Sequence, residues 1–148
     1  MVEATVLEQL LPLMPYMVRA IYEWLLDNGL TPYLLVDVAF VGVQVPNEHA
    51  KDNKMILNVH PSAVNKLRIG NDAIECQMRF NGVVRQIFVP IAAILALYSQ
   101  ENGAGLVFSD SDRALTAAQI QKDTQKEAEA RSAEMTLTLF RNKTKIKK

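Results

Sequence analysis

The chain has 148 residues, of which 49% are hydrophobic and 22% are charged, and its 16 basic and 16 acidic side chains cancel. This length suits one compact domain with an added segment, since domains commonly run to ~100–150 residues. No apolar run approaches the ~20 residues that a membrane-spanning helix needs. Glu3 and Glu8 stand where a secretory signal requires positive charge. A single cysteine excludes an internal disulfide and a multi-cysteine zinc cluster. We therefore expect a cytoplasmic protein that contacts no membrane and holds no metal or other cofactor.

The charge is unevenly distributed along the chain. Residues 1–108 carry a net charge of −3 and residues 109–148 a net charge of +3. All six glycines and nine of the ten aromatic residues precede residue 109, so the second part cannot build a core of its own. The sequence predicts a domain over 1–108 and a flexible tail over 109–148. Residues 113–134 favour helix locally, but their apolar stripe is thin, and we expect transient helix or coil there.

The first predicted element is a helix from Pro15 to Asn28, which Gly29 ends. Its polar side chains form one narrow stripe at i, i+4 and i+8, namely Arg19, Glu23 and Asp27. A helix on the surface of a monomer shows an apolar stripe only ~100° wide, whereas this helix is apolar over most of its circumference. Either the domain wraps the helix or a second copy of the chain packs against it. In a domain this small we favour the second copy, paired about a two-fold axis.

After the helix, the hydrophobic period changes to two and predicts short strands. They are expected at Leu34–Phe40, Val43–Val45, Met55–Val59, Leu67–Ile69 and Leu106–Phe108. A short helix is expected over Ile91–Gln100. Strands without a regular strand–helix alternation favour a small antiparallel barrel or sandwich with one helix ahead of it, which is a mainly β, α+β fold.

The strongest local signal is a hairpin of Ala73–Phe80 and Val83–Val89. Asn81-Gly82 joins the two strands, and this pair suits a type I′ turn, in which both central residues have positive φ. A two-residue loop sets the register. It pairs Phe80 with Val83, Met78 with Arg85, Cys76 with Ile87 and Ile74 with Val89 on one face, and Arg79 with Val84, Gln77 with Gln86 and Glu75 with Phe88 on the other.

The residues that could carry catalysis are few. His49 and His60 lack ligand partners at helical or strand spacing, so surface or capping roles are expected. Cys76 alternates with Ile74 and Met78 and is expected to be a buried hydrophobic residue. We predict no enzymatic activity. The remaining candidate is a strand-lined groove of Met78, Phe80 and Val83, flanked by Arg79, Arg85 and Gln86, that takes an extended peptide with acidic or amide side chains.

An RNA-binding barrel is the alternative function. Single-strand binding needs a basic stripe with aromatic residues for stacking. The domain is net acidic, and only the last eight residues, with five basic groups, could attract phosphate. Binding of nucleic acid is therefore disfavoured.

Several motifs resemble the SspB, or stringent starvation protein B, family. The most specific is Tyr22-Glu-Trp-Leu-Leu-Asp-Asn28. The resemblance covers about residues 15–108 and includes Pro15-Tyr16, Leu30-Thr-Pro32, Gly42-Val-Gln-Val-Pro46, Asn71-Asp72, Arg79-Phe80, Arg85-Gln86, Val89-Pro90 and Glu101-Asn-Gly-Ala-Gly105.

This resemblance implies an adaptor for the ClpXP protease. Members of the family are homodimers with an Sm-like (SH3-like) β-barrel that binds the ssrA tag of products of stalled ribosomes. Their flexible tail docks on the N-terminal zinc-binding domain of ClpX. The implied partners are thus ssrA-tagged polypeptides, ClpX, a second copy and the ribosome.

The resemblance, together with the pattern above, assigns three groups of residues. Peptide binding is expected at Asn71, Gln77, Met78, Arg79, Phe80, Val83, Arg85 and Gln86. The dimer interface is expected at Tyr16, Ala20, Ile21, Trp24 and Leu25. Docking on the protease is expected at Leu139, Phe140, Arg141, Lys145, Ile146, Lys147 and Lys148.

Two departures from the family pattern affect these assignments. The family often shows Phe-Asn-Ala where this chain has Cys76, Gln77 and Met78, and the larger Met78 predicts a reshaped groove and a different tag preference. The family's docking end typically reads Leu-Arg-Val-Val-Lys, whereas this chain ends Thr144-Lys-Ile-Lys-Lys148. Leu139-Phe-Arg141 is therefore a second candidate for the docking segment.

Overall fold

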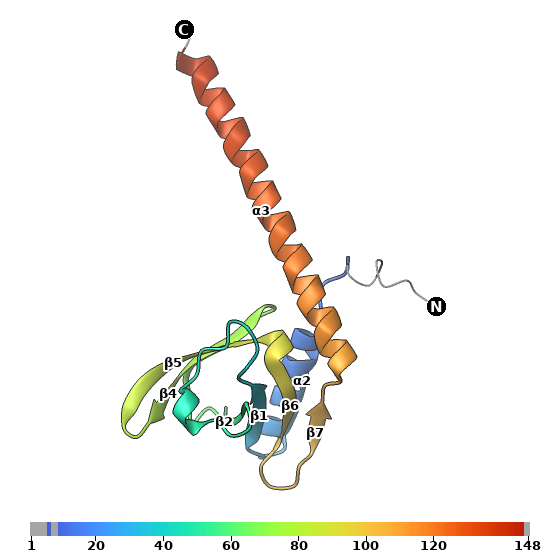
Figure 1. Ribbon diagram of the computed structural model, residues 1–148, viewed down its shortest axis with the longest axis vertical. Coiled ribbons are helices and arrows are strands. Elements are labelled where there is room, and N and C mark those ends of the chain that lie inside the picture. Colours follow the sequence, from blue (N-terminus) through green and yellow to red (C-terminus); the bar gives the residue numbers. More distant parts are fainter. Residues whose placement is uncertain (1–5, 7–8, 147–148) are drawn as a thin grey trace. The chain divides into compact units, whose positions relative to one another are not determined.

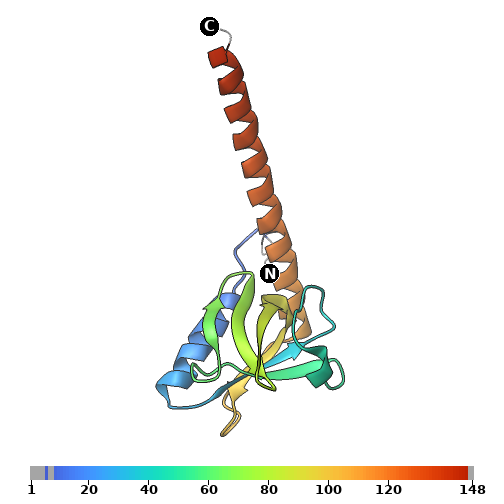
Figure 2. The ribbon, with the colours of Figure 1, turned by 90° about the vertical axis from the view of Figure 1, so that its left-hand side faces the viewer.

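The computed structural model describes residue 6 and residues 9–146, with side chains described up to residue 139. The chain divides into two compact units. One is Pro12–Ala117, and the other combines Met1–Leu11 with Ala118–Lys148. Figures 1 and 2 show the elements of each unit in two perpendicular views.

The unit Pro12–Ala117 consists of helix α2 (Met14–Asp27) and two antiparallel sheets. The first sheet has the order β2-β1-β6-β7, formed by β1 (Pro32–Asp37), β2 (Lys54–Asn58), β6 (Ile94–Ser99) and β7 (Gly105–Val107). The second has the order β3-β4-β5, formed by β3 (Asn65–Ile69), β4 (Ala73–Phe80) and β5 (Val83–Pro90). The fold is therefore α+β, as predicted. Among the described strands, no pairing closes the two sheets into one barrel.

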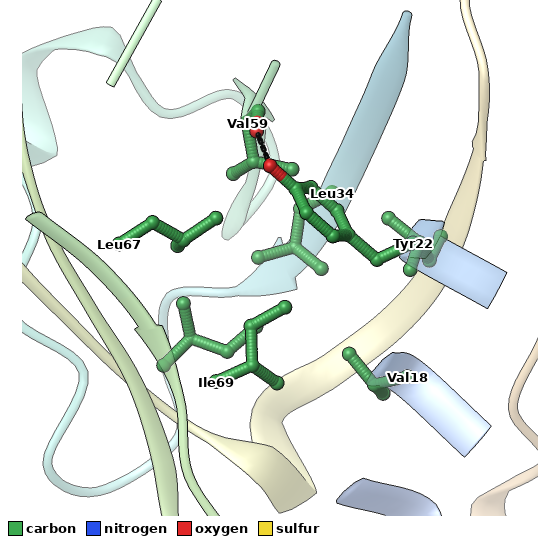
Figure 3. Close-up of a pocket in the computed structure, with 8 residues that line it drawn as sticks. Val18, Tyr22, Leu34, Val59, Leu67 and Ile69 are labelled. Atoms are coloured by element: carbon green, nitrogen blue, oxygen red, sulfur yellow. Dashed lines mark hydrogen bonds between the residues drawn. The ribbon is translucent and has the colours of Figure 1, made fainter. Parts of the chain in front are cut away.

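Helix α2 packs where the inner faces of the two sheets meet, as Figure 3 shows. Val18 and Tyr22 lie against Leu34 from the first sheet and Ile69 from the second, and the space between them holds no water-sized void. The Tyr22 hydroxyl donates a hydrogen bond of 2.8 Å to the carbonyl oxygen of Val59 (Figure 3). Because the seam is filled and its one polar group has a partner, it is part of the core.

The predicted helix Pro15–Asn28 is confirmed to within one residue at each end. Asn28 closes it, and Gly29 follows with φ of 70°, the left-handed conformation expected after a helix. One residue differs from the prediction. Leu25 is fully buried, so it belongs to the core under α2 and not to an outward dimer face. Because α2 is apolar over most of its circumference, the spacing of its apolar residues does not show which side faces the core and which side is exposed.

The hairpin prediction is confirmed in full. Strands β4 and β5 pair from Ala73↔Pro90 to Phe80↔Val83 in the predicted register, and Asn81 and Gly82 have φ of 52° and 79°. The strands predicted near residues 34, 55, 67 and 106 are also present, with ends shifted by a few residues. The Val43–Val45 strand reduces to a single bridge between Gln44 and Phe88.

The helix predicted over Ile91–Gln100 is wrong. The segment forms a short 3-10 helix, η2 (Ile91–Ala93), followed by strand β6. Its alanines and leucines favour helix locally, but β6 lies between β1 and β7 and hydrogen-bonds to both. Pairing on two sides and burial on the inner face outweigh a propensity of well under ~1 kcal/mol per residue.

The expectation of transient helix or coil for residues 113–134 is also wrong, because helix α3 (Asp110–Ile146) runs through them without a break. No proline or glycine interrupts these residues, and the side chains of residues 123–139 are mostly exposed. Arg131 and Glu127 form one of the i,i+4 ion pairs, at 3.9 Å. The helix is supported by the high helix propensity of its residues, even though its apolar stripe is thin. Within the described part of the chain, neither α2 nor α3 has the length and apolar character together that crossing a bilayer would require.

Candidate functional site

The confirmed register of the hairpin distributes the predicted peptide-binding residues over two faces. Residues directly opposite each other in an antiparallel pair point to the same side, and alternate residues point to opposite sides. The inner face therefore carries Met78, Phe80, Val83 and Arg85, and the outer face carries Gln77, Arg79, Val84 and Gln86. This division into two faces is the one that the predicted register implied.

The most distinctive feature of the hairpin is a free edge on β4. Pairing with β3 extends from Ile69↔Ile74 only as far as Asn65↔Gln77. Beyond that point, no named strand of the described chain lies beside Met78–Phe80 on the β3 side. The backbone groups on this side of the strand are thus available to an added strand.

A groove of about 290 Å³ lies along this free edge. The segment that leads into β3 forms one wall, and the hairpin forms the other. The lining residues are Ser62, Ala63, Val64, Asn65, Gln77, Met78, Arg79 and Val84. The groove is therefore mixed in character, with four apolar side chains, one hydroxyl, two amide groups and one guanidinium group.

A second depression of about 280 Å³ lies on the same sheet, and Gln77 lines both. It is lined by Gln44, Lys66, Glu75, Cys76, Gln77, Gln86, Ile87 and Phe88. Gln77 and Gln86 stand directly opposite each other in the register. Their amides offer both donors and acceptors, which suits the main chain of an extended peptide.

The inner face of the hairpin is partly covered by the short 3-10 helix η1 (Asn47–His49). The His49 ring stacks on Phe80, with centroids 5.3 Å apart and planes at 25°. Glu48 Oε1 lies 3.4 Å from Arg85 Nη2. Neither Glu48 nor His49 was singled out as a site residue from the sequence, since no periodicity connects a loop to a strand some 30 positions later.

Asn71 is placed apart from both grooves. Its side-chain oxygen accepts a 3.0 Å hydrogen bond from Arg19 of α2, which also donates to the carbonyl of Ile69 at 3.1 Å. Asn71 does not line either depression. Its contact with Arg19 links α2 to the second sheet, and the assignment of Asn71 to peptide binding stays a prediction.

The predicted dimer residues other than Leu25 lie on the accessible side of α2. Tyr16 and Ala20 are exposed, Ile21 is half-buried, and Trp24 is 48% exposed. The guanidinium of Arg19 lies over the Tyr16 ring, 4.6 Å from its centroid. An exposed tryptophan and tyrosine on one helix form an apolar patch of the kind found at interfaces.

The predicted docking residues lie at the C-terminal end. Leu139 is an exposed residue of α3. Phe140, Arg141, Lys145 and Ile146 continue the helical backbone, and their side chains lie outside the described part of the chain. Lys147 and Lys148 lie outside the described residues altogether.

The residues that were considered for catalysis are Cys76, His49 and His60. Cys76 is buried as predicted, and burial raises the pKa of its thiol to about 11, which keeps it protonated and unreactive. His49 stacks on Phe80, and His60 Nδ1 lies 2.8 Å from the Ser62 hydroxyl. Within residues 6 and 9–139, no three His, Cys, Asp or Glu side chains come together as metal ligands would.

Comparison with known proteins identifies the family. The sequence profile described as "Stringent starvation protein B" matches residues 12–146. The chain belongs to the SspB family. A relative from Haemophilus influenzae, named "Stringent starvation protein B homolog", is 43% identical over 114 residues, which are 77% of this chain and 75% of the relative. The SspB profile covers α2, both sheets and α3, so it extends well beyond the residues 15–108 over which the resemblance was first seen.

Proposed function

We propose that this SspB-family protein is a non-catalytic cytoplasmic adaptor that binds the ssrA degradation tag and delivers tagged polypeptides to the ClpXP protease. The observation that supports this most directly is the groove along the free edge of β4. An unpaired strand edge beside a mixed apolar and polar lining is suited to a short extended peptide, and it holds no groups arranged for chemistry.

The tag would bind as an added strand beside Met78–Phe80. Main-chain hydrogen bonds to the free edge supply affinity, and alternate side chains meet the lining. Arg79 favours an acidic side chain, while Asn65 and Gln77 favour amides. In this arrangement the two sheets act as an open Sm-like barrel whose gap between β3 and the hairpin tip is the binding site.

The tail would act as a tether. Joining the tag site to a docking segment makes the second binding event intramolecular, with an effective concentration up to the millimolar range. The 37 residues of α3 span ~55 Å as a helix at ~1.5 Å per residue, and ~30 Å on average as a coil of similar length. The docking segment would be Leu139–Arg141 or residues 145–148, and its partner the N-terminal zinc-binding domain of ClpX.

Two copies would pair through the exposed face of α2, with Tyr16, Ala20, Ile21 and Trp24 in contact. A homodimer doubles the tethers and adds avidity toward an oligomeric protease. Trp24→Asp should give monomers in sedimentation velocity, because it places a carboxylate in an apolar interface. Glu23→Gln on the neighbouring exposed position is the control. A wild-type chain that sediments as a monomer would contradict the homodimer.

Binding is tested by fluorescence anisotropy of a labelled ssrA peptide against the full chain. Arg79→Ala should weaken binding by about tenfold to a hundredfold, since a hydrogen bond to a charged group contributes ~1.5–3 kcal/mol. Arg68→Ala is the matched control, because Arg68 is an exposed arginine of the same sheet that lines neither groove. Absence of saturable binding by the wild-type chain would refute the tag-binding role.

Delivery is tested separately by removing residues 118–148, which leaves the compact unit Pro12–Ala117. The shortened chain should bind the peptide as well as the full chain does, yet should not accelerate degradation of a tagged substrate by ClpXP. Undiminished acceleration would show that the tail is not the tether.

A further inference from the structure

The tip of the β4–β5 hairpin needs support that the sheet does not give it. On one side, β3 stops at Asn65↔Gln77. On the other, the outer edge of β5 has, among the described residues, one backbone bridge, between Phe88 and Gln44. From Met78 to Arg85 the described chain is therefore a two-stranded ribbon, and an isolated ribbon is at best marginally stable in water. The same ribbon supplies the free edge and one wall of the candidate groove.

The helix η1 contacts this ribbon at two points, both on the inner face. His49 stacks on Phe80, and Glu48 pairs with Arg85. Figure 1 shows η1 beside the hairpin. The groove is lined by the inner residue Met78 and by the outer residues Gln77, Arg79 and Val84. The helix η1 therefore contacts the ribbon from the side opposite to most of this lining.

The segment that carries η1 is itself fixed at both ends. Gln44 exchanges two backbone hydrogen bonds with Phe88, of 2.8 and 3.0 Å. Lys51 exchanges two with Lys54, each of 2.9 Å. Pro46, between Gln44 and η1, is buried. A short helix held between two such anchor points can transmit rigidity to whatever it contacts.

We propose that η1 is a brace for the hairpin tip, and that Glu48 and His49 are positioning residues that hold the free edge of β4 ready for the peptide. This inference rests on the proposed function, because it names the device that prepares that same groove. Without the brace the ribbon frays, and the peptide must order it on binding, which lowers the affinity.

The size of the effect follows from the two contacts. The Glu48–Arg85 pair is exposed on both sides, and such pairs contribute little, so its loss should weaken peptide binding by about two- to fivefold. The stack of His49 on Phe80 is worth somewhat more, about two- to tenfold. The double variant should lose about tenfold or more.

The test uses the full chain with Glu48→Gln, His49→Ala and both together. Glu127→Gln is the matched control, because Glu127 forms a similarly exposed ion pair with Arg131, at 3.9 Å, on helix α3, and lines neither depression. Two quantities are measured, namely anisotropy of the labelled ssrA peptide and amide hydrogen exchange of the free protein. We expect faster exchange at residues 79–85, unchanged exchange at residues 73–77, and weaker binding for the first three variants only.

Rescue separates positioning from direct contact with the ligand. His49→Phe keeps an aromatic ring on Phe80 and should restore both exchange protection and affinity relative to His49→Ala. Glu48→Arg should weaken binding, and Glu48→Arg with Arg85→Glu should recover it. The charge-swapped variant could regain protection of the tip from hydrogen exchange without regaining affinity for the peptide. That result would mean that Arg85 contacts the peptide itself, and it would overturn the assignment of the ion pair.

Two results would overturn the brace as a whole. One is unchanged tip exchange in the Glu48 and His49 variants. The other is tighter peptide binding, which would mean that Glu48 occupies Arg85 in competition with the ligand. If the wild-type chain binds no tag peptide, the proposed function fails, while hydrogen exchange in the free protein still decides whether η1 supports the tip.

Discussion

The base and the tip of the β4–β5 hairpin share one register but have different surroundings. At the base, Ile87 and Val89 of β5 are 2% and 0% exposed, whereas at the tip Val83 and Val84 are 55% and 48% exposed. The same type of side chain in the same strand thus belongs to the core at one end and lies in the solvent-exposed tip at the other. What differs is the packing: Ile87 and Val89 point into the core from the inner face, whereas Val83 stands beyond the point where β3 stops pairing with β4, and Val84 points outward.

The largest expected difference between the two ends is in core stability. Ile87→Ala should lower the free energy of unfolding by ~2–5 kcal/mol, because it leaves a cavity among packed side chains. Val83→Ala should lower it by less than ~1 kcal/mol, because the side chain is already half in water. Urea unfolding of the two variants measures both values. Equal losses would show that the tip is as much a part of the core as the base.

A second test compares two glycines with the same backbone strain. Gly29 and Gly82 have φ of 70° and 79°, and a Cβ at either position would meet no atom within 4 Å. Alanine in this left-handed conformation costs ~1–2 kcal/mol. Gly29→Ala, at the end of α2, should show this cost in global unfolding. Gly82→Ala should show less in global unfolding and instead faster hydrogen exchange at residues 79–85. The opposite ranking would mean that the tip unfolds only together with the core.

A third test concerns acid, and it acts away from the hairpin. The Glu101 carboxylate accepts hydrogen bonds from the Thr31 hydroxyl, at 2.6 Å, and from the Thr31 backbone N–H, at 2.9 Å. These bonds, the side-chain bond first, lower the pKa of Glu101 below its ordinary value of 4.5. The folded chain therefore binds fewer protons there than the unfolded chain, so the contact stabilises the fold above that value and is lost as pH falls through the lowered pKa.

The measurement is stability against pH for the wild-type chain and Glu101→Gln. The variant should show a shallower loss of stability below pH 4.5, with no difference in tip exchange at residues 79–85. A change in tip protection would mean that the turn after β6 and the hairpin tip are coupled.

The smallest expected effect is that of salt on the tip. The Glu48–Arg85 pair is exposed, so its attraction is screened as ionic strength rises toward ~1 M. Tip exchange in the wild-type chain should rise less than about twofold, and Glu48→Gln should show no salt dependence there. If hydrogen exchange of the tip depended equally on salt in the wild-type chain and in Glu48→Gln, the salt dependence would have to arise from groups other than the Glu48–Arg85 pair.

The local features of the fold were predictable from the sequence, because their causes are local. Asn81-Gly82 requires positive φ at both turn positions, and a two-residue loop then sets every pair from Phe80↔Val83 to Ile74↔Val89. Pro15 and Gly29 set the ends of α2 for similar reasons. The SspB family is likewise indicated by short motifs of neighbouring residues, and the family profile matches residues 12–146.

Tertiary structure decided where the same residues face water, another strand or the core. Leu25 and Trp24 are adjacent apolar residues of α2, yet Leu25 is buried and Trp24 is exposed. The reason is that only one side of the helix packs against the sheets. The segment 94–99 is a strand because β1 and β7 lie on either side of it. The free edge of β4 and the contact of η1 with Phe80 depend in the same way on residues distant in the sequence. The sequence thus determined helix α2 and the register of the hairpin, whose causes are local, while the folded chain determined that 94–99 is a strand and which edge of β4 stayed open.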